Sequence, residues 1–320
     1  MVSSPPAAAG AASASNGAFA LALIAAQTER LRRLRPEVLE DGDREPLHQL
    51  RVSLRRLRTA LRQFAPALVL PERAGGRRIA ALARRTGLCR DLDVLRDHLD
   101  HQLLPHLSDG ECQALRPLLK PLRRRRRQAF AAVVELLEAG RWERLLQRLE
   151  AWQQRPVFTA LGEEPLAEWL LEWARPLTAG LFLDPGWWAR QPQDPALHEL
   201  RKRIKGVRYG LEPLVAQLDP AVQAWIGPLK QAQSALGALQ DLQVLEALLL
   251  QDPARRQGVP AACLEGVAVE LERQRAVGWE QWGVARAQLL RPECRLALPS
   301  LSPWPIPAGE RGEGAGAAGS

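Results

Sequence analysis

The chain has 320 residues, of which 46% are hydrophobic and 25% charged, and its formal net charge is +8. These values are typical of a soluble globular protein with enough apolar material for one large domain or two domains of ordinary size. The positive balance favours a polyanionic partner, namely nucleic acid, polyphosphate or an anionic membrane surface, without choosing among them. Only four of the 44 basic residues are lysine. Genomic base composition alone can favour arginine, so the positions of the arginines carry more information than their number.

The two ends of the chain, residues 1–16 and 296–320, are rich in Ala, Ser, Pro and Gly, and we expect both to be disordered tails. The apolar run from Ala18 follows no basic segment and leads directly into a helical pattern. We therefore interpret it as the start of the first core helix and not as a secretory signal peptide. No stretch reaches the roughly 18 uninterrupted apolar residues of a membrane span. The four cysteines lack metal-site spacing, and we expect reduced thiols in a cytoplasmic protein.

Between these ends, apolar residues recur at i, i+3, i+4 and i+7 almost throughout, which predicts an all-α protein. Proline and glycine cluster in a few short segments and leave long helices between them. These segments are Pro66–Gly76, Pro105–Gly110, Pro185–Pro195, Pro213–Pro220 and Pro253–Pro260.

An internal repeat relates the two halves of the chain at an offset of 150 residues, the separation of His48 and His198. At the same offset, GLCRDLDVL (Gly87–Leu95) matches GALQDLQVL (Gly237–Leu245). Two signatures kept in one register predict a duplication. The period is too long for a solenoid and fits a bundle of about four helices. We therefore predict two tandem four-helix bundles, residues 17–155 and 156–295.

The repeated helices, which read HQLRVSLRRLRTALRQF and HELRKRIKGVRYGLEPL, each separate cations from apolar residues. At ~100° per residue, one narrow stripe of each helix is cationic and the opposite side is apolar. The predicted stripes contain His48, Arg51, Arg55, Arg58 and Arg62 in the first half, and His198, Arg201, Lys205 and Arg208 in the second. The predicted core faces contain Leu50, Leu54, Leu57, Leu61 and Phe64, and Leu200, Ile204, Val207, Leu211 and Leu214.

A solvated helix face explains most charge runs, but like charges at this spacing repel each other, and the first stripe contains no glutamate. The planar guanidinium group of arginine binds two phosphate oxygens at once, and the lysine ammonium group adds a point charge. A protonated histidine adds a contact that depends on pH. The recurrence of the stripe in both halves therefore favours a polyanion-binding surface.

These two motifs, with LCRDLDVL and LGALQDLQVL, resemble the CHAD domain family, a histidine-centred α-helical domain, over about residues 18–290. The resemblance implies two bundles related by a pseudo-two-fold axis, basic helix faces around a central groove or pore, and binding of inorganic polyphosphate. It also implies, for some members, association with polyphosphate granules. It adds Lys202 to the contact residues, and Asp91 and Asp241 suit the orientation of motif arginines.

The chain departs from the family pattern in the second motif and in its domain content. Glu212 occupies the place of Arg62, and Gly206 and Gly210 interrupt the helix at a cost of roughly 1 kcal/mol each relative to alanine. We expect the glycines to permit close approach of a neighbouring helix or of the ligand. The ExExK signature of the CYTH domain that accompanies many relatives does not occur in the sequence.

Other segments give weaker candidates. In the run Arg123–Arg127, helical geometry allows Arg123 and Arg127 to face one ligand, and Arg84 and Lys230 are further candidates for polyphosphate contact. A solvated helix end or a nucleic-acid patch explains the run nearly as well. His98, His101 and His106 lack a recognised metal-ligand pattern. We expect Trp187 and Trp188 to lie in a loop that packs down onto the rest of the protein or contacts a partner.

We found no P-loop, GxSxG or HExxH motif and no carboxylate cluster within the stripes. The sequence therefore favours non-enzymatic polyphosphate binding that needs no cofactor, at granules or beside a separate phosphate-handling enzyme. Two alternatives stay open. One is a nucleic-acid-binding helical protein, and the other is a phosphohydrolase or its accessory protein.

Overall fold

The computed structural model describes residues 14–218, 220–251 and 259–297. Most of the two predicted tails, residues 1–13 and 298–320, therefore lies outside the described residues. The tail boundaries need correction, because Asn16 is fully buried at the start of the first helix and Pro292–Ala297 is helical.

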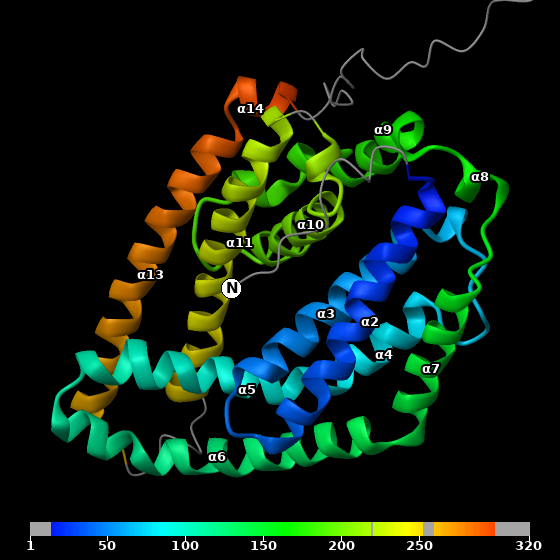
Figure 1. Ribbon diagram of the computed structural model, residues 1–320. Coiled ribbons are helices and arrows are strands. Elements are labelled where there is room, and N and C mark those ends of the chain that lie inside the picture. Colours follow the sequence, from blue (N-terminus) through cyan, green and yellow to red (C-terminus); the bar gives the residue numbers. More distant parts are fainter. Residues whose placement is uncertain (1–13, 219, 252–258, 298–320) are drawn as a thin grey trace, which may run out of the picture.

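The described residues form helices and turns without a β-strand, which confirms the all-α prediction (Figure 1). The first half contains α2 (Asn16–Glu40), α3 (Glu45–Gln63), α4 (Gly76–Arg85), α5 (Gly87–His98), α6 (Asp109–Glu138) and α7 (Gly140–Gln154). The second half contains α8 (Ala160–Glu163), α9 (Leu166–Thr178), α10 (Ala196–Leu211), α11 (Pro220–Glu246), α13 (Ala261–Leu289) and α14 (Pro292–Ala297). None of the helices in these ranges has the length and apolarity needed to cross a bilayer.

The order of elements recurs along the chain. Helices α3 and α10 carry the two motifs, and α4 with α5 occupies the place that α11 takes in the second half. A short π-helix follows in both halves, at Leu99–Leu103 and Ala247–Gln251, before the long helices α6 and α13. The α4–α5 break falls at Thr86, which is fully buried and donates its hydroxyl to Ala83 O. The position 150 residues later is a leucine inside α11.

The core faces of the two motif helices are those that the helical wheel predicts. All ten predicted apolar residues, from Leu50 to Phe64 and from Leu200 to Leu214, are at most 2% exposed. They belong to one hydrophobic cluster that runs through both halves. The division into two separate bundles at residue 155 stays a prediction, because the halves share this core.

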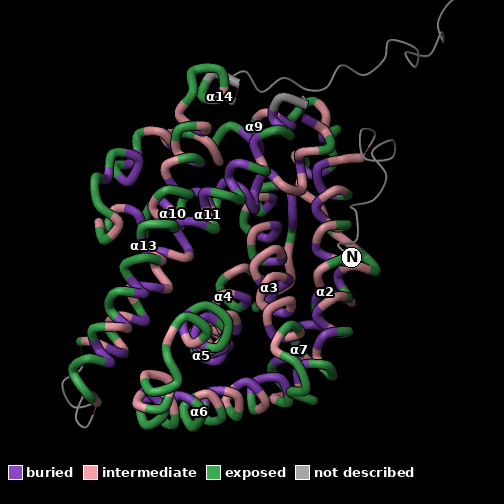
Figure 2. Tube along the Cα trace, turned by 90° about the vertical axis from the view of Figure 1, so that its left-hand side faces the viewer, coloured by how far each residue is buried: buried purple, intermediate pink, exposed green. Residues whose placement is uncertain are grey.

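Helix α5 lies between two other parts of the molecule. In Figure 1, α6 runs below α5 while α10 lies above it, and Figure 2 shows α5 nearly end-on with the same neighbours. Helix α5 packs against α6 and also against α11, and α10 packs against α3. This arrangement brings the two motif helices together on one side of α5 and leaves α6 on the other.

Candidate functional site

The two motif helices meet through a tyrosine and an ion pair. Arg55 Nη1 on α3 donates a 2.7 Å hydrogen bond to the Tyr209 hydroxyl on α10, and its guanidinium carbon lies 5.0 Å from the ring centre. Arg208 also contacts this ring, with its guanidinium carbon 4.2 Å from the centre. Arg56 Nη2 lies 3.5 Å from Glu212 Oε2 across the same interface. These contacts hold the two cationic stripes close together.

Five cations gather at this interface, and we name them the cationic cluster. Its members are Arg51 and Arg55 on α3, and Arg201, Lys205 and Arg208 on α10. The pKa of Lys205 is lowered to about 7, first by burial and then by the neighbouring charges of Arg55, Arg201, Arg51 and Arg208, in that order. Lys205 has no hydrogen bond or ion pair with any residue that the structure describes. An anion bound here would offset the mutual repulsion of the cluster.

Arg51 and Arg201 hold equivalent places in the two halves. Arg51 Nη1 donates to Ala83 O at 2.8 Å and to Thr86 Oγ1 at 2.9 Å. A methyl group on Gly87 would lie 3.7 Å from Arg51 Nη1, and one on Gly237 would lie 3.3 Å from Arg201 Nη2. The two glycines are 150 residues apart, so each arginine packs against the same position of the repeat.

Arg201 differs from Arg51 in its hydrogen bonding, because its Nε is buried without a hydrogen-bond partner. The aspartates act on the two arginines through charge. Burial lowers the pKa of Arg51 and Asp91 opposes this shift, while burial raises the pKa of Asp241 and Arg201 opposes it. The hydrogen bonds that orient Arg51 come from Ala83 and Thr86, not from the aspartate that the sequence suggested.

The two motif histidines have different neighbours. His48 is half-buried, and its pKa is lowered first by this burial and then by Arg90. His198 is exposed, and its Nδ1 lies 2.8 Å from Gln240 Oε1. Arg90 and Gln240 are themselves equivalent positions of the repeat, so a cation accompanies the first histidine and an amide the second.

Four further predicted arginines, on α3, α4 and α10, fall into two groups. Arg58, Arg62 and Arg84 are exposed and lie close enough together for the last two to lower the pKa of Arg58, after partial burial. Arg208 is 9% exposed and donates to Gln233 Oε1 at 3.1 Å and to Glu212. The first group is free to meet a ligand, whereas internal partners occupy Arg208.

Two exposed lysines complete this set. Lys202 Nζ lies 2.6 Å from Glu199 Oε1, whereas Lys230 on α11 has no ion-pair partner in the described part of the chain. Their predicted contacts with polyphosphate, like those of the other stripe residues, stay predictions.

The arginine run on α6 divides into one structural residue and several exposed ones. Arg126 Nε donates to the fully buried Asp93 on α5 at 2.9 Å, and Arg126 Nη2 donates to Asp41 at 2.6 Å. Arg123 and Arg127 are exposed on α6, which lies on the far side of α5 from α10. Their predicted contact with polyphosphate stays a prediction.

Sequence reasoning missed the contribution of Tyr209, Arg56 and Glu212. Tyr209 is the single tyrosine of the chain, and it lies four residues after Lys205 in the second motif. We interpreted Glu212 as a residue that weakens the stripe, but it pairs with both Arg208 and Arg56. Gly210 permits the predicted close approach, since a methyl group there would lie 2.7 Å from Leu177 Cδ2, whereas the space around Gly206 is open.

Other candidate features lie apart from the cationic cluster. His98 Nε2 is 2.8 Å from Gln274 Oε1, and His101 pairs with Asp97, so these histidines have partners within the fold. Within residues 14–218, 220–251 and 259–297, no group of three metal-ligating residues comes together. Trp187 packs down, stacked 5.5 Å from Trp282, while Trp188 is 67% exposed.

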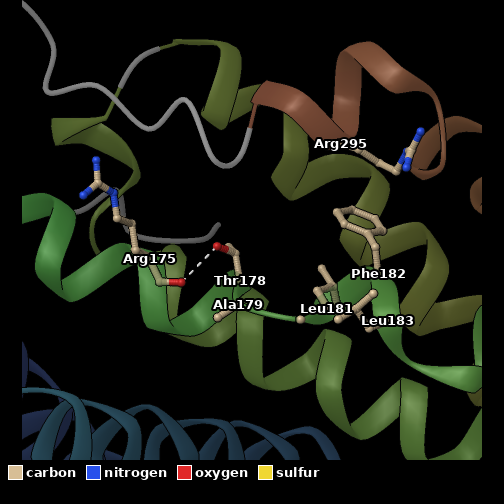
Figure 3. Close-up of a pocket in the computed structure, with 8 residues that line it drawn as sticks. Arg175, Thr178, Ala179, Leu181, Phe182, Leu183 and Arg295 are labelled. Carbon is tan, nitrogen blue, oxygen red and sulfur yellow. Dashed lines mark hydrogen bonds between the residues drawn. The ribbon is translucent and has the colours of Figure 1, made fainter.

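Two cavities lie in the second half. One of about 380 Å³ is lined mainly by apolar residues around Phe182, with Arg175 and Arg295 at its ends (Figure 3). Another of about 410 Å³ is lined by Trp188, Trp279 and their neighbours. Neither cavity is lined by a residue of the cationic cluster. We place the candidate site at the α3–α10 interface, because the cations of the two motif helices meet there.

Comparison with known proteins finds matches in sequence and in fold. The family model described as CHAD domain matches residues 22–250. A crystal structure of the CHAD domain from the plant Ricinus communis is 26% identical, with a TM-score of 0.62, over 90% of this chain and 92% of that one. PptA from Streptomyces chartreusis is 18% identical, with a TM-score of 0.64, over 85% of this chain and 99% of that one. The comparison with curated proteins found no match.

Proposed function

Because the chain belongs to the CHAD domain family, a family associated with polyphosphate, we propose that it binds inorganic polyphosphate through the cationic cluster and the adjoining stripes. The observation that carries this proposal is the convergence of α3 and α10, which places five cations together and leaves Lys205 without an acidic partner. Charge-assisted hydrogen bonds from these groups suit the closely spaced oxygens of a phosphate chain. Attachment to polyphosphate granules in the cytoplasm is part of the same proposal.

We assign binding without catalysis to this site. Guanidinium groups do not deprotonate in proteins, so the arginines offer donors for phosphate oxygens and no general base. Lys205 is the member of the cluster that can exchange a proton near neutral pH, and we assign its proton to ligand binding. Association with a separate phosphate-handling enzyme is compatible with this function.

Single-stranded nucleic acid fits the cluster less well than polyphosphate. Single-stranded nucleic acids are held by exposed aromatic rings interleaved with cations. Tyr209, whose ring contacts two arginines of the cluster, is 6% exposed and lies between them. Its ring is therefore occupied by the fold and not available to a base.

The test of the proposed function is a calorimetric titration of the wild-type protein with long-chain polyphosphate and with a DNA duplex, at equal phosphate concentration and several salt concentrations. We expect polyphosphate to bind at least about tenfold more tightly, with an affinity that falls steeply with salt as counterions are released. Comparable affinity for the duplex would favour the nucleic-acid alternative. Phosphate release above background with Mg²⁺ or Mn²⁺ would favour the phosphohydrolase alternative.

Polyphosphate binding should also take up a proton at Lys205. Its pKa of about 7 in the free protein rises when phosphate oxygens surround it, so binding above pH 7 requires protonation. The affinity should therefore fall as the pH rises from about 7 towards the pKa of the bound state, by up to about tenfold per pH unit. Burial lowers the pKa of His48, so any contribution from this histidine appears at lower pH.

Calorimetry at pH 8 in two buffers of different ionisation enthalpy measures this uptake directly. The wild type should take up as much as one proton per site, and Lys205→Arg, which keeps the charge, should take up fewer. Equal proton uptake by the two proteins would assign the linkage to another group. A repeat of these titrations below pH 7 tests the sequence-based prediction that protonation of His48 and His198 strengthens binding.

A further inference from the structure

Helix α6 carries a second row of basic side chains, which lies outside the cationic cluster. Between Glu111 and Glu135 the sequence contains seven basic residues and no acidic one. Four of them share one side of the helix at i, i+4, i+7 and i+11, the spacing of the arginines on α3. These four residues, which we name the α6 stripe, are Arg116, Lys120, Arg123 and Arg127.

All four side chains of the α6 stripe are exposed, and none forms an ion pair or hydrogen bond with another described residue. The charges of α13, by contrast, are neutralised locally. On α13, Arg273 pairs with Glu270 and Arg275 pairs with Glu272. The α6 stripe instead keeps like charges at neighbouring positions, where they repel each other. A bound polyanion would remove this repulsion.

The stripe is separate from the cationic cluster. Arg126, between stripe members Arg123 and Arg127 in the sequence, fixes the inner face of α6 against Asp93 of α5. At ~100° per residue, the stripe lies about 60–120° around the helix from Arg126, away from the buried residues. Both views of the molecule place α5 between α6 and α10 (Figures 1 and 2). A ligand must therefore pass around α5 to touch both surfaces.

We propose that the α6 stripe is a second polyphosphate-binding surface, and that one long chain occupies it together with the cationic cluster. This inference rests on the proposed function. The four charges extend over about 16 Å of helix, which suits an extended phosphate chain. Once the cluster holds a long chain, contact with the stripe is an intramolecular event at high effective concentration. Short chains occupy one surface at a time, so the protein prefers long chains.

The composition of the stripe favours this ligand over other polyanions. Residues 116–127 contain no aromatic side chain on which a base could stack. They also contain none of the exposed large apolar residues of the described chain, which a helix needs in order to enter a membrane surface. A bare phosphate polymer needs neither feature.

The experiment compares tripolyphosphate with long-chain polyphosphate by calorimetry on three full-length variants. The stripe variant is Arg116→Gln/Lys120→Gln/Arg123→Gln/Arg127→Gln, and the cluster variant is Arg201→Gln/Lys205→Gln. The charge-matched control is Arg141→Gln/Arg144→Gln/Arg148→Gln/Arg155→Gln, which changes four exposed arginines on and just after α7.

We expect the stripe variant to bind tripolyphosphate within about twofold of the wild type and long chains at least about tenfold more weakly. For long chains, the slope of log affinity against log salt concentration should be shallower by about 3, since about four phosphate contacts are lost. The α7 control should bind both ligands nearly as the wild type does.

The outcomes separate this inference from the proposed function. Wild-type affinity for long chains in the stripe variant, with a loss in the cluster variant, would overturn the second surface and leave the proposed function standing. An equal loss of affinity in the α7 control would mean that the effect comes from net charge alone, and it would also overturn the second surface. Absence of polyphosphate binding by the wild type would overturn the proposed function itself. Loss of duplex DNA binding with unchanged polyphosphate binding in the stripe variant would assign the stripe to nucleic acid instead.

Discussion

The cluster variant, Arg201→Gln/Lys205→Gln, should bind long-chain polyphosphate at least about 100-fold more weakly than the wild type. Hydrogen bonds to charged groups contribute about 1.5–3 kcal/mol each, and this variant removes two such groups from the centre of the cluster. Neither side chain forms a hydrogen bond or ion pair with the rest of the described chain, so the α3–α10 interface should persist. Calorimetric titration at fixed salt measures the change.

A two-charge control, Arg144→Gln/Arg148→Gln on α7, should bind polyphosphate within about threefold of the wild-type affinity. Salt screens the interaction between the ligand and exposed charges far from it. Thermal unfolding followed by circular dichroism checks that both variants fold. A folded cluster variant with wild-type affinity would place polyphosphate elsewhere on the molecule. Arg51→Gln and Arg55→Gln are less informative alone, since both residues also form hydrogen bonds within the fold.

The sequence predicted the inner side of each motif helix well, because the 3.6-residue period of an α-helix determines which side chains face the same way. Every apolar residue assigned to α3 and α10 is buried. The same period placed Arg51, Arg55, Arg201 and Lys205 on one side of their helices, and the structure brings these four together. Periodicity, however, carries no information about which distant side chain a residue will meet.

Partnerships across the chain account for most of what the sequence could not predict. Arg126 looked like one of five equivalent arginines, and its role depends on Asp41, which is 85 positions away, and on the buried Asp93. Glu212 looked like a loss of positive charge, and its partner Arg56 belongs to the other half. The break between α4 and α5 depends on Thr86, whose buried hydroxyl hydrogen-bonds to Arg51 and Ala83. Each of these features requires knowledge of packing between helices.

Replacing Arg126 with methionine should lower the free energy of unfolding by about 3–5 kcal/mol, the cost of removing one partner from a buried ion pair. Asp93 is fully buried, and Arg126, whose side chain is 15% exposed, is its single ion-pair partner in the described structure. The same guanidinium holds Asp41 of the α2–α3 loop and lies 4.8 Å from the centre of the Phe130 ring. One side chain therefore joins α6 to α5 and to the α2–α3 loop. Urea unfolding followed by circular dichroism measures the loss.

Arg125→Met is the matched control, because Arg125 is the exposed neighbour of Arg126 and has no ion-pair partner among the described residues. Its free energy of unfolding should change by no more than about 0.5 kcal/mol. The double variant Asp93→Asn/Arg126→Met should recover part of the stability lost in Arg126→Met, since it no longer buries an unpaired charge. If Arg126→Met unfolds at the wild-type urea concentration but binds polyphosphate less tightly, Arg126 contributes to the ligand surface and its ion pairs are not what holds α6 in place.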